Sequence, residues 1–119
     1  MKRVLIVDDE PLSATVIEMF LSDRGHPVAT AHSGGEAEQV AGQFRPEVLL
    51  TDYRLGDMSA AALIGRLQAM NPSIQAIVLT GLPPDQVSEG LAELGSIKVF
   101  TKPTELDEIA AAIEGAPVA

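Results

Sequence analysis

The sequence predicts an α/β fold, in which a parallel sheet carries helices on both of its faces. Short aliphatic or β-branched runs alternate five times with longer stretches of helical periodicity. Three of the short runs (VLIV, VLL and AIVL) are almost continuously apolar, which is typical of strands that are covered on both sides. A strand followed by a helix, repeated in this way, favours parallel strands joined by right-handed crossovers.

Five segments are predicted to be strands. They are Arg3–Val7, Pro27–Ala31, Glu47–Thr51, Gln75–Leu79 and Ile97–Thr101. The chain has 119 residues, of which 46% are apolar, and this is enough for one hydrophobic core without disulfide or metal crosslinks. We therefore expect a single domain over residues 1–119.

The first two helices are predicted from apolar periodicity and from residues that favour helix ends. The segment Leu12–Arg24 has Pro11 near its start and Gly25, which suits a left-handed cap, after its end. Its apolar residues repeat at helical spacing and are Leu12, Val16, Ile17, Phe20 and Leu21. In the second helix, Ser33 and Glu36 form a capping-box pattern ahead of an apolar face.

Three further helices are predicted towards the C-terminus. One contains Ala60–Leu67 and ends before Pro72, and another spans about Asp85–Leu94. The last is expected to begin at Thr104 and to end at Gly115. With the five strands, these five helices complete five strand–helix units.

Composition narrows the functional classes. The formal net charge of −9 disfavours direct binding to nucleic acid or to anionic lipid, because the charges repel. The chain has no cysteine, which excludes disulfides and thiolate metal sites. Its longest apolar runs are too short for a signal peptide or a membrane span, so we expect a soluble, cytoplasmic protein.

Chemically reactive side chains follow four of the predicted strands. Asp8 and Asp9 come after the first strand, Asp52 after the third, Thr80 after the fourth and Lys102 after the fifth. In open parallel sheets, ligands bind beyond the carboxyl ends of the strands, where these residues are expected to meet. The sequence therefore predicts a site with three carboxylates, one hydroxyl and one ammonium group. His26 and His32, near the second predicted strand, are expected to be surface residues away from this site and not ligands.

This set of groups suits phosphoryl chemistry. Carboxylates about 4 Å apart repel each other by roughly 4 kcal/mol at an effective dielectric constant near 20, so a cation is expected among them. Oxygen ligands at an open sheet edge suit Mg²⁺. One carboxylate can then act as a nucleophile towards phosphorus, while a lysine and the metal stabilise the developing charge.

Four motifs in this order, VLIVDDE, VLLTDYRL, IVLTG and TKP, make the chain resemble the receiver domains of two-component response regulators. The resemblance covers essentially the whole chain. It implies a flavodoxin-like (βα)5 fold, a doubly wound parallel five-stranded sheet with strand order 2-1-3-4-5. It also implies a signalling switch that assists its own phosphorylation and dephosphorylation, rather than an enzyme that turns over a substrate.

The resemblance assigns the acidic residues to phosphoacceptance and metal binding. Asp52 would be the phosphoacceptor and would receive its phosphoryl group from a histidine kinase. Asp9 would bind Mg²⁺ directly, and Asp8 directly or through water. Asp52 and the backbone carbonyl of Arg54 would complete the protein ligands of the metal.

The resemblance also assigns the switch residues and the partners. Lys102 would pair with phosphoryl oxygens and Thr80 would move towards them, while the Lys102–Pro103 bond would be cis. The expected partners are a sensor histidine kinase or phosphotransfer protein and a downstream protein. A homodimer through the fourth helix, fifth strand and fifth helix is compatible with this scheme.

Several positions depart from the family pattern. Family members usually carry Tyr or Phe three residues before the lysine, but Val99 stands there and Phe100 follows it. Either a bulge lets Phe100 take that role, or Thr80 is coupled to the output face without an aromatic ring, which is the interpretation we favour. Gly56 replaces a common proline and is expected to loosen the loop after Asp52.

Two other functions remain as alternatives. A pseudo-receiver would use the same fold as an interaction module without phosphorylation. A small phosphatase of the haloacid-dehalogenase type also uses an Asp nucleophile, but it needs a second acid where Arg54 stands. A stand-alone regulator and a fragment of a longer regulator or hybrid kinase both fit the sequence.

Overall fold

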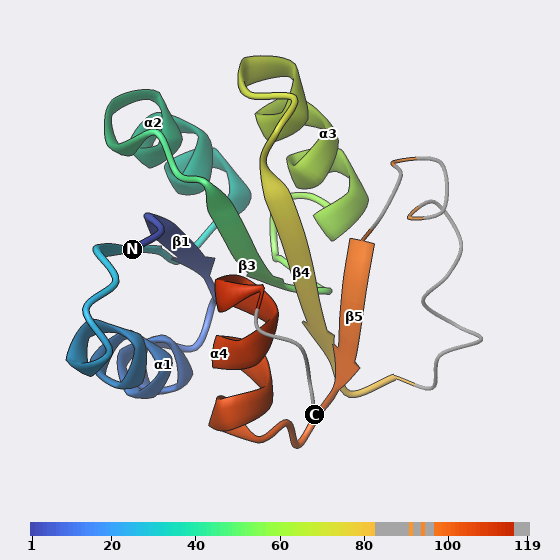
Figure 1. The fold of residues 1–119 in the computed structure, drawn as a ribbon. Helices are drawn as coiled ribbons and strands as arrows, with labels where there is room; N and C mark the ends of the chain where they lie inside the picture. Colours follow the sequence, from blue (N-terminus) through green and yellow to red (C-terminus); the bar gives the residue numbers. More distant parts are fainter. Residues whose placement is uncertain (83–90, 92–93, 95–96, 116–119) are drawn as a thin grey trace.

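A computed structural model of the chain describes residues 1–82, 91, 94 and 97–115. Its five strands form one parallel sheet in the order β2-β1-β3-β4-β5, which confirms the expected topology (Figure 1). The strands are β1 (Val4–Val7), β2 (Val28–Ala31), β3 (Val48–Asp52), β4 (Gln75–Thr80) and β5 (Ile97–Thr101). Asp52 and Thr80 are thus the last residues of their strands, one place inside the predicted loops.

Four helices are found among the described residues, and they cover both faces of the sheet. They are α1 (Pro11–Asp23), α2 (Gly34–Phe44), α3 (Ala60–Met70) and α4 (Leu106–Glu114). Helices α1 and α4 lie on one face, and α2 and α3 lie on the other (Figure 1). The helix expected at about Asp85–Leu94 falls mostly outside the described residues, and α4 corresponds to the predicted fifth helix.

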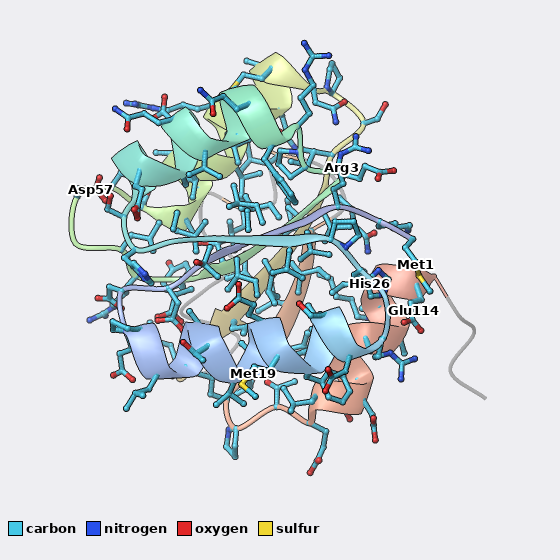
Figure 2. All side chains as sticks on the ribbon, turned by 90° about the vertical axis from the view of Figure 1, so that its left-hand side faces the viewer. Met1, Arg3, Met19, His26, Asp57 and Glu114 are labelled. Carbon is cyan, nitrogen blue, oxygen red and sulfur yellow. The ribbon has the colours of Figure 1, made fainter. Side chains whose placement is uncertain are left out.

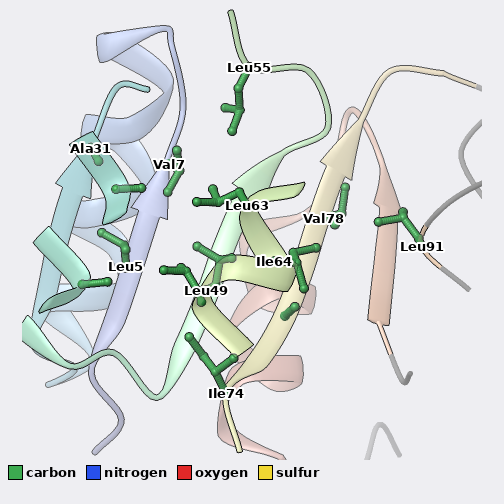
Figure 3. Close-up of a cluster of buried hydrophobic side chains, with 14 residues drawn as sticks. Leu5, Val7, Ala31, Leu49, Leu55, Leu63, Ile64, Ile74, Val78 and Leu91 are labelled. Carbon is green, nitrogen blue, oxygen red and sulfur yellow. The ribbon is translucent and has the colours of Figure 1, made fainter. Parts of the chain in front are cut away.

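The hydrophobic core has two parts, one on each face of the sheet. Leu5 and Val7 of β1 point towards α2 and α3, whereas Val4 and Ile6 point towards α1 and α4. Figure 3 shows the part under α2 and α3, where Leu63 and Ile64 of α3 pack on the central strands. Because both faces are covered, β1 is buried along its whole length, as its apolar run indicates.

Most predicted helix ends are confirmed, but the start of the last helix is not. The Ser33 hydroxyl accepts a hydrogen bond from the Glu36 amide at 3.1 Å, and Gly25 and Gly115 have the positive φ angles of left-handed caps. Helix α4 begins at Leu106 instead of Thr104. The Thr104 hydroxyl donates to the Thr101 carbonyl at 3.0 Å, so it stabilises the loop before the helix instead of capping it.

The apolar face of α1 differs from its prediction. Ile17 and Leu21 are buried with Ala14, but Leu12 is 82% exposed and Val16 is 56% exposed. The buried and the exposed apolar residues both follow helical periodicity, so the sequence pattern alone cannot tell which of the two stripes faces the sheet. The outcome is an apolar stripe on the outer side of α1.

Strand β5 pairs with β4 without a bulge. Val99 lies opposite Val78 and Phe100 opposite Leu79 in an unbroken register. Successive residues of a strand point to opposite faces, and Phe100 packs with the apolar cluster under α1 and α4. The interpretation in which a bulge lets Phe100 take the place of Val99 is therefore wrong.

None of the helices within the described residues is long and apolar enough to span a membrane.

Candidate functional site

Three carboxylates converge at the C-terminal ends of β1 and β3. Asp8, Asp9 and Asp52 each place one carboxylate oxygen within 4.8 Å of the others. Asp8 is buried, Asp52 is half-buried and Asp9 is exposed. The group thus runs from the interior of the sheet edge to solvent, with one open side.

The turn between β1 and α1 holds the first acidic residue in place. The backbone amide of Asp8 donates to the Ala31 carbonyl at 3.1 Å, which continues the pairing of β1 with β2 beyond the strand. The Asp8 side chain accepts a hydrogen bond from the Glu10 amide at 2.9 Å. Its carboxylate is therefore fixed by the backbone on one side and faces the other carboxylates on the other.

Lys102 supplies the positive charge of the site. Its Nζ lies 2.6 Å from Oδ1 of Asp52, and its backbone amide donates to the Thr80 carbonyl at 2.6 Å. The Lys102–Pro103 peptide bond is cis, as the family resemblance implies. The amine therefore points at the expected phosphoacceptor.

The electrostatics of the site favour an additional cation. Burial raises the pKa of the Asp8 carboxyl above its ordinary value, and the Asp52 charge raises it further, although the Glu10 hydrogen bond opposes both. Burial alone would lower the pKa of Lys102, but its hydrogen bond and charge attraction to Asp52 raise it. Three carboxylates thus share one ammonium group.

The donor set fits a hard divalent cation. All three side chains offer oxygen ligands, and hard cations such as Mg²⁺ take oxygen ligands while keeping several waters. The exposed carboxylate of Asp9 leaves room for those waters. Arg54, whose backbone carbonyl is the further expected ligand, follows the end of β3 by two residues.

Thr80 lies beside the carboxylates and is held by the following turn. It is buried, and its hydroxyl accepts a hydrogen bond from the Leu82 amide at 3.0 Å. A hollow of about 220 Å³ is lined by Asp52, Thr80 and Lys102, with residues of the two adjoining loops. Its volume is large enough for a phosphoryl group.

Sequence reasoning missed two residues near the site. His32 is exposed, as expected, but it does not lie away from the site, because its Nδ1 is 3.0 Å from the carbonyl oxygen of Asp8. The carboxylate of Asp57 accepts from the amides of Gly34 and Gly35 at the start of α2. Only the position of His32 directly after a predicted strand could have drawn attention to it.

The other histidine is also placed differently from its prediction. His26 was expected at the surface, but it is 96% buried and its Nε2 lies 2.9 Å from the Glu114 carboxylate. This pair lies at the end of the sheet where β1 begins, away from the carboxylate site (Figure 2).

Comparison with known proteins places the chain in a family. Residues 4–114 match the model of the response regulator receiver domain. The chain is 35% identical over 108 residues to the probable transcriptional regulatory protein TcrX of Mycobacterium tuberculosis, an alignment that covers 89% of this chain and 45% of TcrX. The chain belongs to the response regulator receiver family. It spans less than half the length of that relative.

Solved structures support the same assignment. A CheY-like receiver domain from Methanospirillum hungatei superposes with a TM-score of 0.89 at 24% identity, covering 97% of this chain and 92% of that one, which shows the shared fold. A response regulator from Burkholderia pseudomallei has a TM-score of 0.85 at 30% identity, covering 94% of this chain and 66% of that one. The latter structure contains a phosphorylated aspartic acid, a calcium ion and citrate.

Proposed function

We propose that this chain is a phosphoacceptor switch that takes a phosphoryl group onto Asp52 from a phosphohistidine of a kinase or phosphotransfer protein. The observation that carries the proposal is the geometry around Asp52. Its carboxylate is paired with Lys102 at 2.6 Å and lies within 4.8 Å of the oxygens of two further carboxylates. An acidic cluster that only solubilises a surface has no need of a lysine directed at one of its members.

The metal in this proposal is Mg²⁺, held by Asp8, Asp9, Asp52 and the Arg54 carbonyl. When bound, it would offset the charge of the carboxylates and of the incoming phosphoryl oxygens. The chain's own residues orient the reacting groups. Asp8 is fixed by the Glu10 amide, and Asp52 is fixed by β3 and by Lys102.

The transfer is a simple displacement at phosphorus. An oxygen of the Asp52 carboxylate forms the new P–O bond as the P–N bond to the donor imidazole breaks. The imidazole leaves with the electron pair of that bond and takes a proton from water. Water later attacks phosphorus, which releases inorganic phosphate and restores the carboxylate.

Phosphorylation would change the pairing of the switch residues. In the unphosphorylated chain the ammonium of Lys102 neutralises Asp52. After phosphorylation it would turn to the phosphoryl oxygens, which carry more charge. The Thr80 hydroxyl would exchange the Leu82 amide for a phosphoryl oxygen, pulling on the turn after β4. Because Val99 is not aromatic, the proposed signal travels through this turn and β5 to a downstream protein.

The decisive experiment is incubation with Mg²⁺ and acetyl phosphate followed by intact mass spectrometry. The wild-type chain should gain the mass of one phosphoryl group, and Asp52→Asn should gain none. Asp9→Asn should be phosphorylated only at higher Mg²⁺ concentrations, because the substitution weakens one ligand of the metal. A wild-type chain that stays unmodified at every Mg²⁺ concentration would favour the pseudo-receiver alternative.

A further inference from the structure

We propose that the segment His32–Gly35, which joins β2 to α2 and includes the first two residues of α2, is a bracket that positions both loops of the carboxylate site, and that Asp57 is its principal positioning residue. The inference rests on the proposed function, because it concerns the same site. The bracket contacts the loop after β1 on one side and the loop after β3 on the other. Neither contact uses the side chain of a residue that is assigned to phosphoryl chemistry.

The contact with the β3–α3 loop is made by a carboxylate. The two oxygens of Asp57 each accept one hydrogen bond at 2.9 Å, from the amides of Gly34 and Gly35 (Figure 2). Amides in the first turn of a helix have no partners within the helix, so α2 offers them to the loop. These two bonds lower the pKa of the Asp57 carboxyl below its ordinary value, and the carboxylate stays charged at neutral pH.

An apolar contact reinforces this connection. Gly34 is buried, and a Cβ atom added there would lie only 2.5 Å from Cγ and Sδ of Met58. Met58 therefore occupies the space that any side chain at residue 34 would need. Two consecutive loop residues, Asp57 and Met58, are thus held against the same turn, one by hydrogen bonds and one by packing.

The second side of the bracket contacts the β1–α1 loop. Nδ1 of His32 lies 3.0 Å from the carbonyl oxygen of Asp8, and a carbonyl can only accept, so Nδ1 carries the proton. The His32 amide donates to the Glu36 carboxylate at 2.8 Å, which fixes the turn to the first turn of α2. One short turn therefore touches the backbone of Asp8 and the loop that follows Asp52.

The β3–α3 loop is expected to need contacts with another part of the chain to hold its conformation. Gly56 lies in its middle, and a Cβ there would meet nothing within 4 Å among the described residues. Glycine raises the backbone freedom of an open loop. Arg54, whose carbonyl is the proposed metal ligand, is separated from Asp57 by only two residues, so fixing Asp57 limits where that carbonyl can lie.

The competing explanation is that Asp57 merely caps α2. Ser33 distinguishes the two explanations, because its hydroxyl accepts from the Glu36 amide at 3.1 Å at the same helix end. This hydroxyl makes no hydrogen bond with the β3–α3 loop in the described part of the chain. Ser33→Ala is therefore a matched control that removes a cap of α2 and leaves the bracket contacts in place.

The test compares the full wild-type chain with Asp57→Ala, Asp57→Asn and Ser33→Ala. Mg²⁺ affinity is measured by NMR titration of backbone amides in 0.5 M KCl, where long-range effects of the lost charge are screened. Amide hydrogen exchange of residues 54–58 is measured without metal. Asp57→Ala should bind Mg²⁺ roughly tenfold more weakly, as is common when a group behind a metal ligand is removed.

The other variants make the result specific. Asp57→Ala should also speed exchange of residues 54–58, and Asp57→Asn, which keeps one oxygen acceptor, should fall between it and the wild type in both measurements. Ser33→Ala should keep the wild-type Mg²⁺ affinity and loop exchange even if its melting temperature falls. Equal Mg²⁺ affinity and equal loop exchange for Asp57→Ala and Ser33→Ala would overturn the bracket alone. A wild-type chain that binds no Mg²⁺ and accepts no phosphoryl group would overturn the proposed function, and the bracket with it.

Discussion

At the scale of single residues, Lys102 has two opposed effects. It pairs with Asp52 at 2.6 Å and so relieves repulsion among the carboxylates when no metal is present. The same ammonium repels any divalent cation that enters the cluster. Its side chain is 40% exposed, so each effect is screened by solvent and is modest.

We therefore predict that Lys102→Met lowers metal-free stability but tightens Mg²⁺ binding. Loss of a partly exposed ion pair should cost about 1 kcal/mol of unfolding free energy. Removal of the competing charge should tighten Mg²⁺ binding by roughly fivefold, which corresponds to about 1 kcal/mol. Urea unfolding without metal measures the first effect, and an NMR titration with Mg²⁺ measures the second. Lys98→Met, which changes the same charge elsewhere on the sheet, is the control and should leave Mg²⁺ affinity unchanged.

At the same scale, the hydrogen bonds of one carboxylate connect the last helix, α4, to the segment that follows α1. Glu114, the last residue of α4, accepts two hydrogen bonds from the Arg24 guanidinium, at 2.7 and 2.9 Å, and its carboxylate contacts His26 (Figure 2). The Lys2 amide donates to Nδ1 of His26 at 3.3 Å, so Nε2 carries the proton that faces Glu114. The Arg24 and His26 hydrogen bonds lower the pKa of Glu114 to about 2.

The depressed pKa of Glu114 predicts a particular acid sensitivity. A carboxyl whose pKa is lower in the folded state stabilises the fold above its unfolded pKa, and this contribution is lost as pH falls. The contribution should be complete above about pH 5, near the ordinary value of 4.5, and should vanish towards pH 2. Urea unfolding of the wild type and Glu114→Gln should therefore differ most at pH 6 and converge towards pH 2. A constant difference across this range would show that the ionised carboxylate does not stabilise α4.

At the scale of elements, strands were easier to predict than the orientation of helices. The predicted strands match the structure to within a residue at each end. For β1, β3 and β4 the reason is that a strand buried on both faces needs an uninterrupted apolar run. Helix α1 was harder, since Leu12 and Val16 have the same periodicity as residues that face the sheet. Apolar spacing defines a stripe but not what covers it.

Some residues of the site could likewise be predicted from the sequence, and others could not. Asp8, Asp52 and Lys102 could be predicted because the carboxyl ends of parallel strands meet at one edge, whatever the details of the loops. The roles of His32 and Asp57 could not be predicted, because their contacts depend on the path of a turn and a loop. A short turn carries no periodicity that would indicate which distant backbone groups it meets.

The exposed stripe of α1 leads to a prediction about the protein donor. Leu12, Val16 and Met19 are 56–82% exposed, and Met19 points away from the sheet (Figure 2). Leu12 and Val16 also line a groove of about 620 Å³ between α1 and α4, and Asp8 and Lys102 are among its other lining residues. A donor that delivers a phosphohistidine to Asp52 would cover this groove.

We predict that Leu12→Gln combined with Val16→Gln slows phosphorylation by a protein donor but not by acetyl phosphate. Burying each exposed apolar side chain is worth up to about 1.5–3 kcal/mol, and a tenfold loss of donor affinity needs only about 1.4 kcal/mol. Transfer rates from a phosphorylated histidine protein, measured at several donor concentrations, should show a higher KM. Met70→Gln, which alters an exposed apolar residue at the end of α3, is the matched control. Equal slowing with both donors would instead indicate damage to the carboxylate site.

At the scale of the whole molecule, the acidic site lowers the stability of the metal-free fold. Asp8 is buried and its pKa is raised, so at neutral pH its charged form is less favourable in the folded chain than in the unfolded chain. The molecule has a formal net charge of −9, which adds to this cost. A bound divalent cation would reverse the balance, because it binds the folded state selectively.

Asp8→Asn should therefore raise stability without metal and remove the stabilisation by Mg²⁺. An amide of nearly the same shape avoids burying a charge and can still accept from the Glu10 amide, so metal-free unfolding at pH 7 should cost about 1 kcal/mol more. Mg²⁺ at 100 times its Kd should stabilise the wild type by about 2.7 kcal/mol. For a chain of this size that is a rise in Tm of roughly 10 °C, and the variant should show almost none of it. Calorimetry with EDTA and with excess Mg²⁺ gives both quantities, and the order of the two proteins should reverse between the conditions. If the variant were less stable than the wild type in EDTA, the buried carboxylate would be a stabilising group, and the cation would not be needed to offset its charge.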